Sequence, residues 1–165
     1  MDPVKAAVIT CSNRSAAGER ADDSGELLAK WLADEGHEVI ARLVVPDEID
    51  AIRGSVRAAV DSGAAVVLTT GGTGLTPTDV TPEAVGPLLD REIPGIAEAL
   101  RLIARDRVPT SVLSRGVAGT IGATLVVTLP GSPGGVKDGI AVLTPLLDHA
   151  VDQMSGGDHK AGGGI

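Results

Sequence analysis

The sequence predicts a single-domain α/β protein in which a three-layer, mostly parallel sheet carries helices on both faces. Short aliphatic runs alternate with segments whose apolar residues recur at helical spacing, and several runs end directly in glycine-rich turns. Because parallel strands are joined through helices, this alternation is typical of a sheet covered on both sides. With 165 residues, 43% of them hydrophobic, the chain is long enough to bury one core.

The first half of the chain is expected to contain three strands and two helices. A long polar loop, "CSNRSAAGERADDSG", separates the first strand from the first helix. The strands are expected at residues 4–10, 38–45 and 64–70. The apolar helix positions are Leu27, Leu28, Trp31 and Leu32, then Ile49, Ile52, Val56 and Val60, with Gly36 and Gly63 at the two helix ends.

The second half repeats the order of strand, glycine turn and helix. Helices are expected over residues 82–89 and 95–105, and the run "TLVVTL" from Thr124 predicts another strand. The turn "PGSPGG" follows, and then a helix with Val136, Ile140 and Leu143 on one face. Residues 1–154 are therefore expected to form the domain, and the glycine-rich residues 155–165 a flexible tail.

Composition and charge exclude several classes of function. The net charge of −8 and the single aromatic residue argue against nucleic acid or an anionic membrane as a partner. The N-terminal apolar run is too short for a signal peptide and has no charged region before it, so a cytoplasmic location is expected. The lone Cys11 and three scattered histidines give no zinc-ligand spacing, and Cys11 is interpreted as a small buried residue without chemistry.

The loops that follow the strands are the places where a ligand is expected, because ligands of parallel α/β sheets bind at the carboxyl edge. Three such loops are "PDE", "GGTGLTPTD" and "PGSPGG". Glycines let the backbone approach a ligand, and consecutive N–H groups can cradle an anion such as phosphate. The second loop lacks the ending of a P-loop, and no Rossmann fingerprint is present. The alternative is that these glycines only form tight connections.

Two carboxylates follow strands on this expected edge. Asp47 has an alternative role as an ordinary helix N-cap, and Asp79 as the cap of a turn before Thr81 and Pro82. Packing does not require both on one edge, whereas a Mg²⁺ that serves a polyphosphate uses one or two carboxylates. Together they form a candidate metal-binding and catalytic pair. Cations in or beside the polar loops that could meet an anion are Arg14, Arg115 and Lys137.

A longer set of motifs resembles a known family. The segment "TTGGTGLTPTDVTPEA", with "SNR", "PDE", "DRE", "IPG", "SR" and "LPGSP" in that order, is similar to the molybdopterin-binding family of molybdenum-cofactor biosynthesis. That family includes the bacterial Mog and MoaB type and a domain of gephyrin. The likeness extends over roughly residues 4–154.

The resemblance implies an activity and a set of site residues. The expected reaction is Mg-ATP-dependent adenylylation of molybdopterin, with Asp47 and Asp79 serving Mg²⁺ and catalysis. Further expectations are a homotrimer and a transient contact with the molybdate-inserting enzyme. The matching positions expected to bind nucleotide or pterin are Ser12, Arg14, Asp23, Thr70, Gly71, Gly72, Thr73, Gly74, Ser114, Arg115, Pro130, Gly131 and Ser132.

Two alternatives remain open at this point. One is a protein that binds molybdopterin or a related pterin phosphate without turning it over. Thr78 favours this binding role, because many relatives carry an arginine at this position, and without that cation the triphosphate would be held less tightly. The other is the use of the same domain in longer chains, such as the molybdate-inserting enzymes or the competence-damage-type pyrophosphatases.

Overall fold

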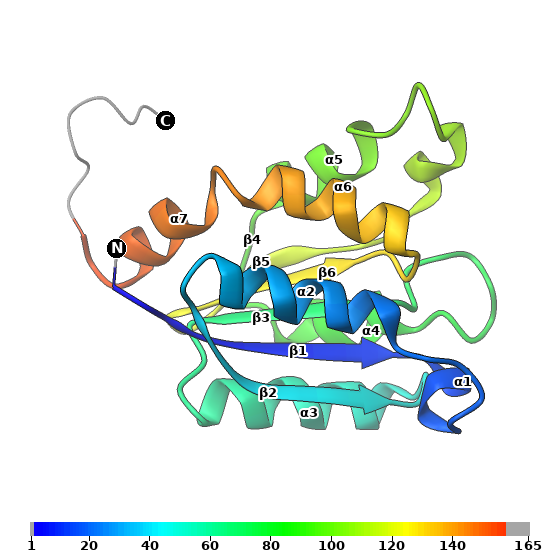
Figure 1. The fold of residues 1–165 in the computed structure, drawn as a ribbon, viewed down its shortest axis with the longest axis horizontal. Coiled ribbons are helices and arrows are strands. Elements are labelled where there is room, and N and C mark those ends of the chain that lie inside the picture. Colours follow the sequence, from blue (N-terminus) through cyan, green and yellow to red (C-terminus); the bar gives the residue numbers. More distant parts are fainter. Residues whose placement is uncertain (1, 158–165) are drawn as a thin grey trace.

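The computed structural model describes residues 2–157 and shows a six-stranded sheet between two layers of helices (Figure 1). The strand order is β2-β1-β3-β6-β5-β4. The strands are β1 (Lys5–Cys11), β2 (Glu38–Val45), β3 (Val66–Thr70), β4 (Arg91–Glu92), β5 (Ala118–Ile121) and β6 (Thr124–Leu129). The α-helices are α1 (Asn13–Ala16), α2 (Asp23–Asp34), α3 (Ile49–Asp61), α4 (Thr81–Val85), α5 (Pro94–Leu102), α6 (Pro133–Leu143) and α7 (Leu147–Met154), with 3-10 turns at Gly86–Leu88 and Pro109–Leu113.

The predicted mostly parallel sheet is confirmed. β1 pairs in parallel with β2 and β3, and β3 pairs in parallel with β6. Two short antiparallel strands, β5 and β4, complete the sheet beyond β6 and were not predicted. β5 joins β6 through a tight turn at Gly122, whose φ of 56° favours glycine. A four-residue strand and a two-residue strand are too short for alternation to reveal them.

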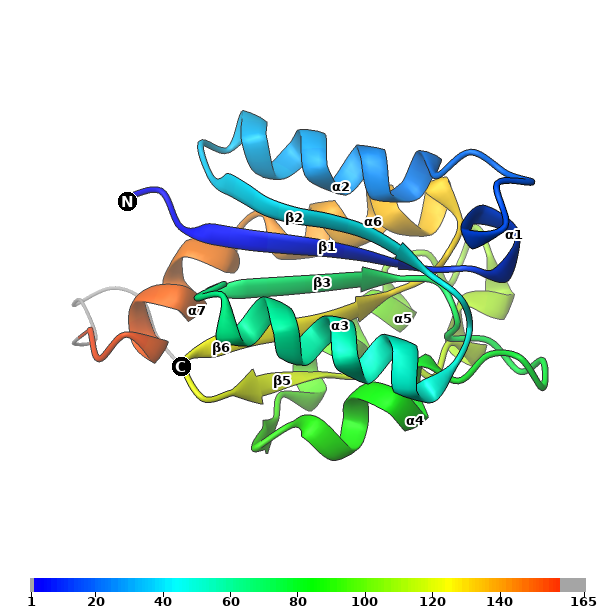
Figure 2. The same ribbon diagram turned by 90° about the horizontal axis from the view of Figure 1, so that it is seen from below.

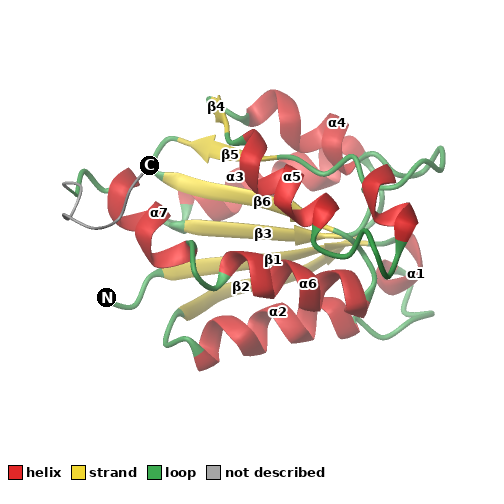
Figure 3. Cartoon of the chain, turned by 90° about the horizontal axis from the view of Figure 1, so that it is seen from above, coloured by secondary structure: helices red, strands yellow, loops and turns green. Residues whose placement is uncertain are grey.

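Two clusters of aliphatic side chains hold the layers together. Along β1, Ala6 and Val8 pack on the side of α2 and α6, whereas Ala7 and Ile9 pack on the side of α3. Figure 3 shows the layer that contains α2 and α6 lying over the strands. Strands buried on both faces need apolar residues at every position, which explains the unbroken runs in the sequence. Trp31, the one tryptophan of the chain, packs in the cluster on the side of α2 and α6.

The helices of the second half differ in part from the expected ones. The segment expected to be one helix over residues 82–89 is α4 followed by a 3-10 turn. The helix expected to reach residue 105 ends as α5 at Leu102. Two elements, α1 and α7, were not predicted; α1 is a single turn inside a polar loop. None of the helices between residues 2 and 157 has the length and apolarity needed to cross a membrane.

The carboxyl ends of β1, β2, β3 and β6 lie at one edge of the sheet, beside α1 (Figure 2). The loops that follow these strands therefore meet there, although they are far apart in the sequence. Of the predicted tail, residues 155–157 form a turn that hydrogen bonds back to α7, and residues 158–165 lie outside the described residues.

Candidate active site

The glycine turn after β3 is fixed by backbone contacts on both sides. The N–H of Gly71 donates to the carbonyl of Leu129 at the end of β6 at 3.0 Å. Thr81 donates from its hydroxyl to the carbonyl of Gly71 at 2.9 Å and from its N–H to the carbonyl of Gly72 at 3.0 Å. The φ values of Gly71 and Gly72 are 98° and 69°, and a Cβ on Gly71 would collide with the carbonyl oxygen of Cys11. Glycine is therefore required here for both conformation and space.

Asp47 follows β2 and is bound to the loop after β1. Its Oδ2 accepts from the N–H of Asn13 at 3.0 Å, and its own N–H donates to Oδ1 of Asn13 at 2.8 Å. Asp47 does not cap α3, because the residue at the N-cap is Glu48 and no side chain caps that helix. The other oxygen, Oδ1, is buried and has no hydrogen-bond partner among the described residues. A Cβ on Gly72 would lie 3.3 Å from this oxygen, so Oδ1 faces the glycine turn.

Asp79 lies on the other side of the same turn. Its Oδ2 accepts from the N–H of Thr76 at 3.0 Å and from the Thr76 hydroxyl at 2.7 Å, so its side chain points back into the loop. It does not cap α4, whose N-cap residue is Val80 and has no side-chain capping bond. A Cβ on Gly74 would lie 2.7 Å from Oδ2 of Asp79. The glycine thus leaves room for the carboxylate beside the turn.

The two carboxylates influence each other electrostatically. Burial raises the pKa of Asp47, the N–H of Asn13 opposes this shift, and the negative charge of Asp79 raises the pKa further. An added cation would reduce the repulsion between the two carboxylates and would give the Oδ1 atom of Asp47 a partner. Mg²⁺ commonly uses one or two carboxylates and takes its other ligands from water and substrate phosphates. Asp47 and Asp79 fit that description, and the described residues contain no larger cluster of ligating side chains.

Arg115 holds the glycine loop in place. Its guanidinium donates to the carbonyls of Gly74 at 2.9 Å and Asp79 at 2.8 Å, and to Oε1 of Glu83 at 2.6 Å. Its backbone N–H donates to the carbonyl of Thr73 at 2.8 Å. Arg115, which the sequence predicts to bind a ligand, thus uses three side-chain donors within its own chain and positions the loop.

The loop after β1 contains two residues that sequence reasoning missed. Asp22 caps α2 by accepting from the N–H of Gly25 at 3.0 Å, and it also accepts from the Thr10 hydroxyl at 2.8 Å. The neighbouring Asp23, which the sequence predicted as a site residue, is exposed. Asn13, which anchors Asp47, was also missed. Its place in the motif "SNR", two residues after the end of β1, was a signal that could have found it.

Two pockets open at this edge, and they share a wall. The first, of about 520 Å³, lies between the glycine turn, the segment after α5 and the start of α6. The second, of about 830 Å³, lies between the glycine turn and the loops after β1 and β2. The shared wall consists of Gly72, Asp79, Gly131 and Ser132.

The predicted site residues divide between these pockets, apart from Arg115, which lines neither. Ser132 caps α6 by accepting from the N–H of Gly135 at 3.1 Å. The Thr70 hydroxyl donates to the carbonyl of Pro130 at 2.6 Å. Besides the shared wall, the first pocket is lined by Thr73, Gly74, Ser114 and Pro130, and the second by Ser12, Arg14, Asp23, Asp47, Thr70 and Gly71.

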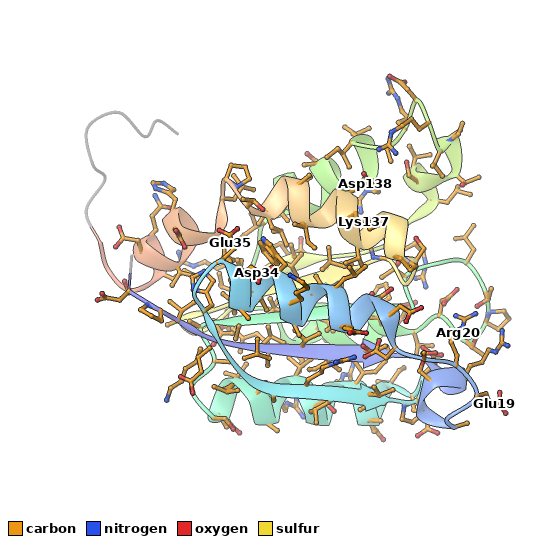
Figure 4. The ribbon with its side chains drawn as sticks, in the orientation of Figure 1. Glu19, Arg20, Asp34, Glu35, Lys137 and Asp138 are labelled. Atoms are coloured by element: carbon orange, nitrogen blue, oxygen red, sulfur yellow. The ribbon has the colours of Figure 1, made fainter. Side chains whose placement is uncertain are left out.

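The cations near the pockets differ in their exposure and in whether they line a pocket. Arg14 and Arg20 line the second pocket, and neither guanidinium makes a hydrogen bond or ion pair within residues 2–157. Lys137 is exposed on α6 and lines neither pocket. Figure 4 shows Arg20 near α1 and Lys137 on α6. Cys11 is buried, and burial raises the pKa of its thiol to about 12, so it stays protonated and inert at neutral pH.

Comparison with known proteins gives consistent matches. The family model described as "Probable molybdopterin binding domain" matches residues 7–149. The chain is similar to the molybdenum cofactor biosynthesis bifunctional protein of Synechococcus elongatus, with 42% identity over 156 residues that cover 94% of this chain and 49% of that protein. It therefore spans about half the length of that relative.

Two further matches cover nearly whole chains. Molybdenum cofactor biosynthesis protein B of Escherichia coli K12 is 40% identical over 149 residues, which cover 88% of this chain and 86% of that protein. The solved structure of the molybdopterin biosynthesis Mog protein from Mycobacterium ulcerans has a TM-score of 0.88 and 44% identity, covering 92% of this chain and 99% of the other.

Proposed function

This chain belongs to the molybdopterin-binding domain family of molybdenum-cofactor biosynthesis, and we propose that it catalyses the Mg-ATP-dependent adenylylation of molybdopterin. The family resemblance read from the sequence is thereby confirmed. The observation that carries the proposal is the wall shared by the two pockets. Two ligands bound side by side, each with a phosphate at that wall, would bring their reacting atoms together at Gly72 and Asp79.

The proposed step joins the two ligands through one new bond. An oxygen of the terminal phosphate of molybdopterin attacks the α-phosphorus of ATP, and the bond from that phosphorus to the β-phosphate oxygen breaks. The products are adenylylated molybdopterin and pyrophosphate. The attacking phosphate is already an anion, so the step needs no general base and no covalent intermediate on the protein. Catalysis of such a transfer rests mainly on positioning and charge stabilisation.

Residues in and around the shared wall would provide this positioning and charge stabilisation. The glycines bring backbone N–H groups close to the phosphates without a side chain in the way. Ser132 caps α6, so the positive end of that helix lies beside both pockets. Arg115 fixes the loop that carries Asp79, which keeps the geometry ready before substrates arrive. Arg14 and Arg20 are free to contact phosphate oxygens in the second pocket.

Asp47 and Asp79 would hold the magnesium ion. When bound, Mg²⁺ supplies positive charge that offsets the phosphates at the point of transfer. The protein has a net charge of −8 and repels a triphosphate at long range, so local cations must provide the attraction. The buried, unpartnered Oδ1 atom of Asp47 is the observation on the protein side that favours a cation there.

Binding without turnover is the second candidate function. The observation that favours it is Thr78, which lines the second pocket and contributes a hydroxyl group 3.2 Å from the Thr76 hydroxyl instead of a cation. A pocket with fewer cations holds the triphosphate less tightly. In that case the chain would capture molybdopterin through the same residues and release it unchanged.

One assay separates the two candidates. The protein is incubated with purified molybdopterin and Mg-ATP, and pyrophosphate is quantified over time. We expect pyrophosphate release that depends on both molybdopterin and Mg²⁺. Binding of molybdopterin with no pyrophosphate released above the protein-free control would contradict adenylylation and favour the binding protein.

A further inference from the structure

An ion pair lies at the end of the first pocket that is distant from the shared wall. NH2 of Arg107, after α5, donates to Oδ1 of Asp138 on α6 at 2.9 Å, so the pair joins two walls of the pocket. The side chain of Asp138 is 23% exposed, and that of Arg107 is 66% exposed. Apart from Asp79 at the shared wall, these are the charged residues that line this pocket. Figure 4 shows Asp138 on α6.

The position of Asp138 along α6 sets its distance from the phosphate site. Ser132 caps the helix at the shared wall, and Asp138 stands six residues later in the same helix. At the rise of an α-helix, six residues correspond to about 9 Å. A phosphate held at Ser132 would therefore place the far end of a fused-ring ligand, and not its phosphate, near Asp138.

The lining between these two points is suited to a flat ring. Leu100, Ala104 and Val108 provide an apolar wall on the α5 side. Gly134 and Gly135 on α6 leave the opposite side without bulky side chains. An apolar slot that ends in one charged group fixes the orientation of a heterocycle, because only an edge with matching donors can pair with that group.

The chemistry of a carboxylate distinguishes between the two rings of the proposed reaction. Arg107 occupies one site on Oδ1 of Asp138, and a carboxylate has about four acceptor sites in total. A 2-amino-4-oxopteridine presents two adjacent donors, the N3–H and the 2-amino group, which pair with the two oxygens of a carboxylate. Adenine presents one amino donor beside the N1 lone pair, which a carboxylate would repel.

Resting on the proposed function, we infer that Asp138 determines ring specificity in the first pocket by accepting from the N3–H and 2-amino group of the pterin. Arg107 is a positioning residue that holds the carboxylate toward the pocket. The nucleotide then belongs in the second pocket, and the two ligands occupy the site together.

The test uses two small probes that differ at one position of the ring. The probe 6-hydroxymethylpterin carries the 2-amino donor, and 6-hydroxymethyllumazine carries an oxygen acceptor in its place. Fluorescence titration without nucleotide gives the dissociation constant of each. Because a hydrogen bond to a charged group is lost and a repulsion is added, the wild type should bind the pterin about tenfold to a hundredfold more tightly.

Variants assign this preference to Asp138. D138N offers one acceptor and one donor, which suit the lumazine edge, so the preference should vanish or invert. D138E keeps the carboxylate and should retain a preference for the pterin. The matched control is D106N, because the side chain of Asp106 is 98% exposed and lies outside the pocket; it should behave as wild type. Thermal melting verifies that each variant is folded.

Four results would overturn the inference: equal affinities of the wild type for both probes, an unchanged preference in D138N, no binding of either probe by the wild type at millimolar concentration, or direct displacement of the pterin by Mg-ATP. Failure of the proposed function is separate, because it appears as missing pyrophosphate release in the presence of a normal pterin preference. Saturating Mg-ATP should leave the pterin dissociation constant within about twofold of its value without nucleotide, since the nucleotide belongs in the other pocket. Direct displacement of the pterin by Mg-ATP would contradict the inference.

Discussion

At the scale of single residues, Asp47 links stability to function. Its folded-state pKa is raised above the ordinary value of 3.8, chiefly by burial. The folded protein therefore binds this proton more tightly than the unfolded chain does. The stabilisation from protonation is fully present below the ordinary pKa and is lost as pH rises through the folded pKa. Ionisation of Asp47 therefore lowers the stability of the folded protein.

This leads to a prediction for D47N. The amide keeps an oxygen that can accept from the N–H of Asn13 and removes the unfavourable charge, so the variant should melt at a higher temperature than wild type at pH 7. The difference should shrink as pH falls through the raised folded-state pKa of Asp47 and be smallest below 3.8, where wild-type Asp47 is protonated in both the folded and the unfolded state. Calorimetric melting at several pH values checks this. A D47N protein that is less stable than wild type at pH 7 would contradict the burial argument.

Asp79 gives a prediction on activity. D79N should keep the fold, because an amide oxygen can still accept from Thr76, but it removes a negative charge from the proposed magnesium site. We expect a loss in turnover of about a hundredfold or more, the size seen when one preorganised charge-stabilising group is removed.

The control for D79N is a second aspartate that accepts from a backbone N–H away from the site. Oδ2 of Asp90 accepts from the N–H of Gly122 at 2.7 Å, and Asp90 lines neither pocket. D90N should therefore retain wild-type turnover. Near wild-type turnover in a folded D79N protein would remove Asp79 from the mechanism.

The sequence predicts where a residue lies in the fold when the chain order itself carries that information. Asp47 and Asp79 could be identified because each follows a predicted strand, and parallel strands bring their carboxyl ends to one edge. Asn13 could not be identified, because its contact with Asp47 spans 34 residues and depends on the register of two loops. Arg115 was identified as a cation near the site, but its use of three donors within the protein required the structure.

At the scale of elements, we expect the glycine turn after β3 to be sensitive to substitution. Gly72 has a φ of 69°, and a Cβ there would collide with the Thr81 hydroxyl and approach Asp47. G72A should weaken Mg-ATP binding by at least about tenfold, because the turn must shift away from the phosphates. Titration calorimetry with ATP, with and without Mg²⁺, measures the effect.

Gly63 provides the matched comparison for G72A. Its φ is 88°, but a Cβ there has open space, and Gly63 precedes β3 whereas the turn follows that strand. Both alanine variants should lose about 1 to 2 kcal/mol of stability from the left-handed backbone. Only G72A should lose nucleotide binding. Tight Mg-ATP binding by a folded G72A protein would mean that the phosphates do not bind at this turn.

Prediction of the elements from the sequence depended on their length. The strand β2 has the predicted bounds, and the helices α2 and α3 end two residues before the glycines predicted at their ends, because several residues repeat one periodicity. β4, β5 and α1 have two, four and four residues, which is too few for a period to appear. The helix α7 was missed although Leu147 and Val151 are buried at helical spacing.

At the scale of the whole molecule, exposed apolar side chains gather on one segment. Five of them follow or end α5, and their exposed fractions lie between 41% and 54%. A surface of this kind is typical of a contact between subunits. The residues are Leu102, Ile103, Val108, Val112 and Leu113.

The corresponding prediction concerns assembly. The family resemblance implies a homotrimer, so light scattering at micromolar concentration should give about three times the chain mass of 16.6 kDa. V112D with L113D would place charges on the exposed segment and should reduce this mass if the segment forms the contact. A wild-type protein that scatters as a monomer at that concentration would contradict the trimer.

The central claim is that a phosphate oxygen of molybdopterin attacks the α-phosphorus of ATP at the wall between the two pockets. Mass spectrometry of the products tests it most directly when the terminal phosphate of molybdopterin is labelled with ¹⁸O and the ATP is unlabelled. The account predicts that all of the label stays in adenylylated molybdopterin and that the released pyrophosphate carries none. Label in the pyrophosphate or in free AMP, or no covalent product from folded wild-type protein with Mg²⁺, would contradict it.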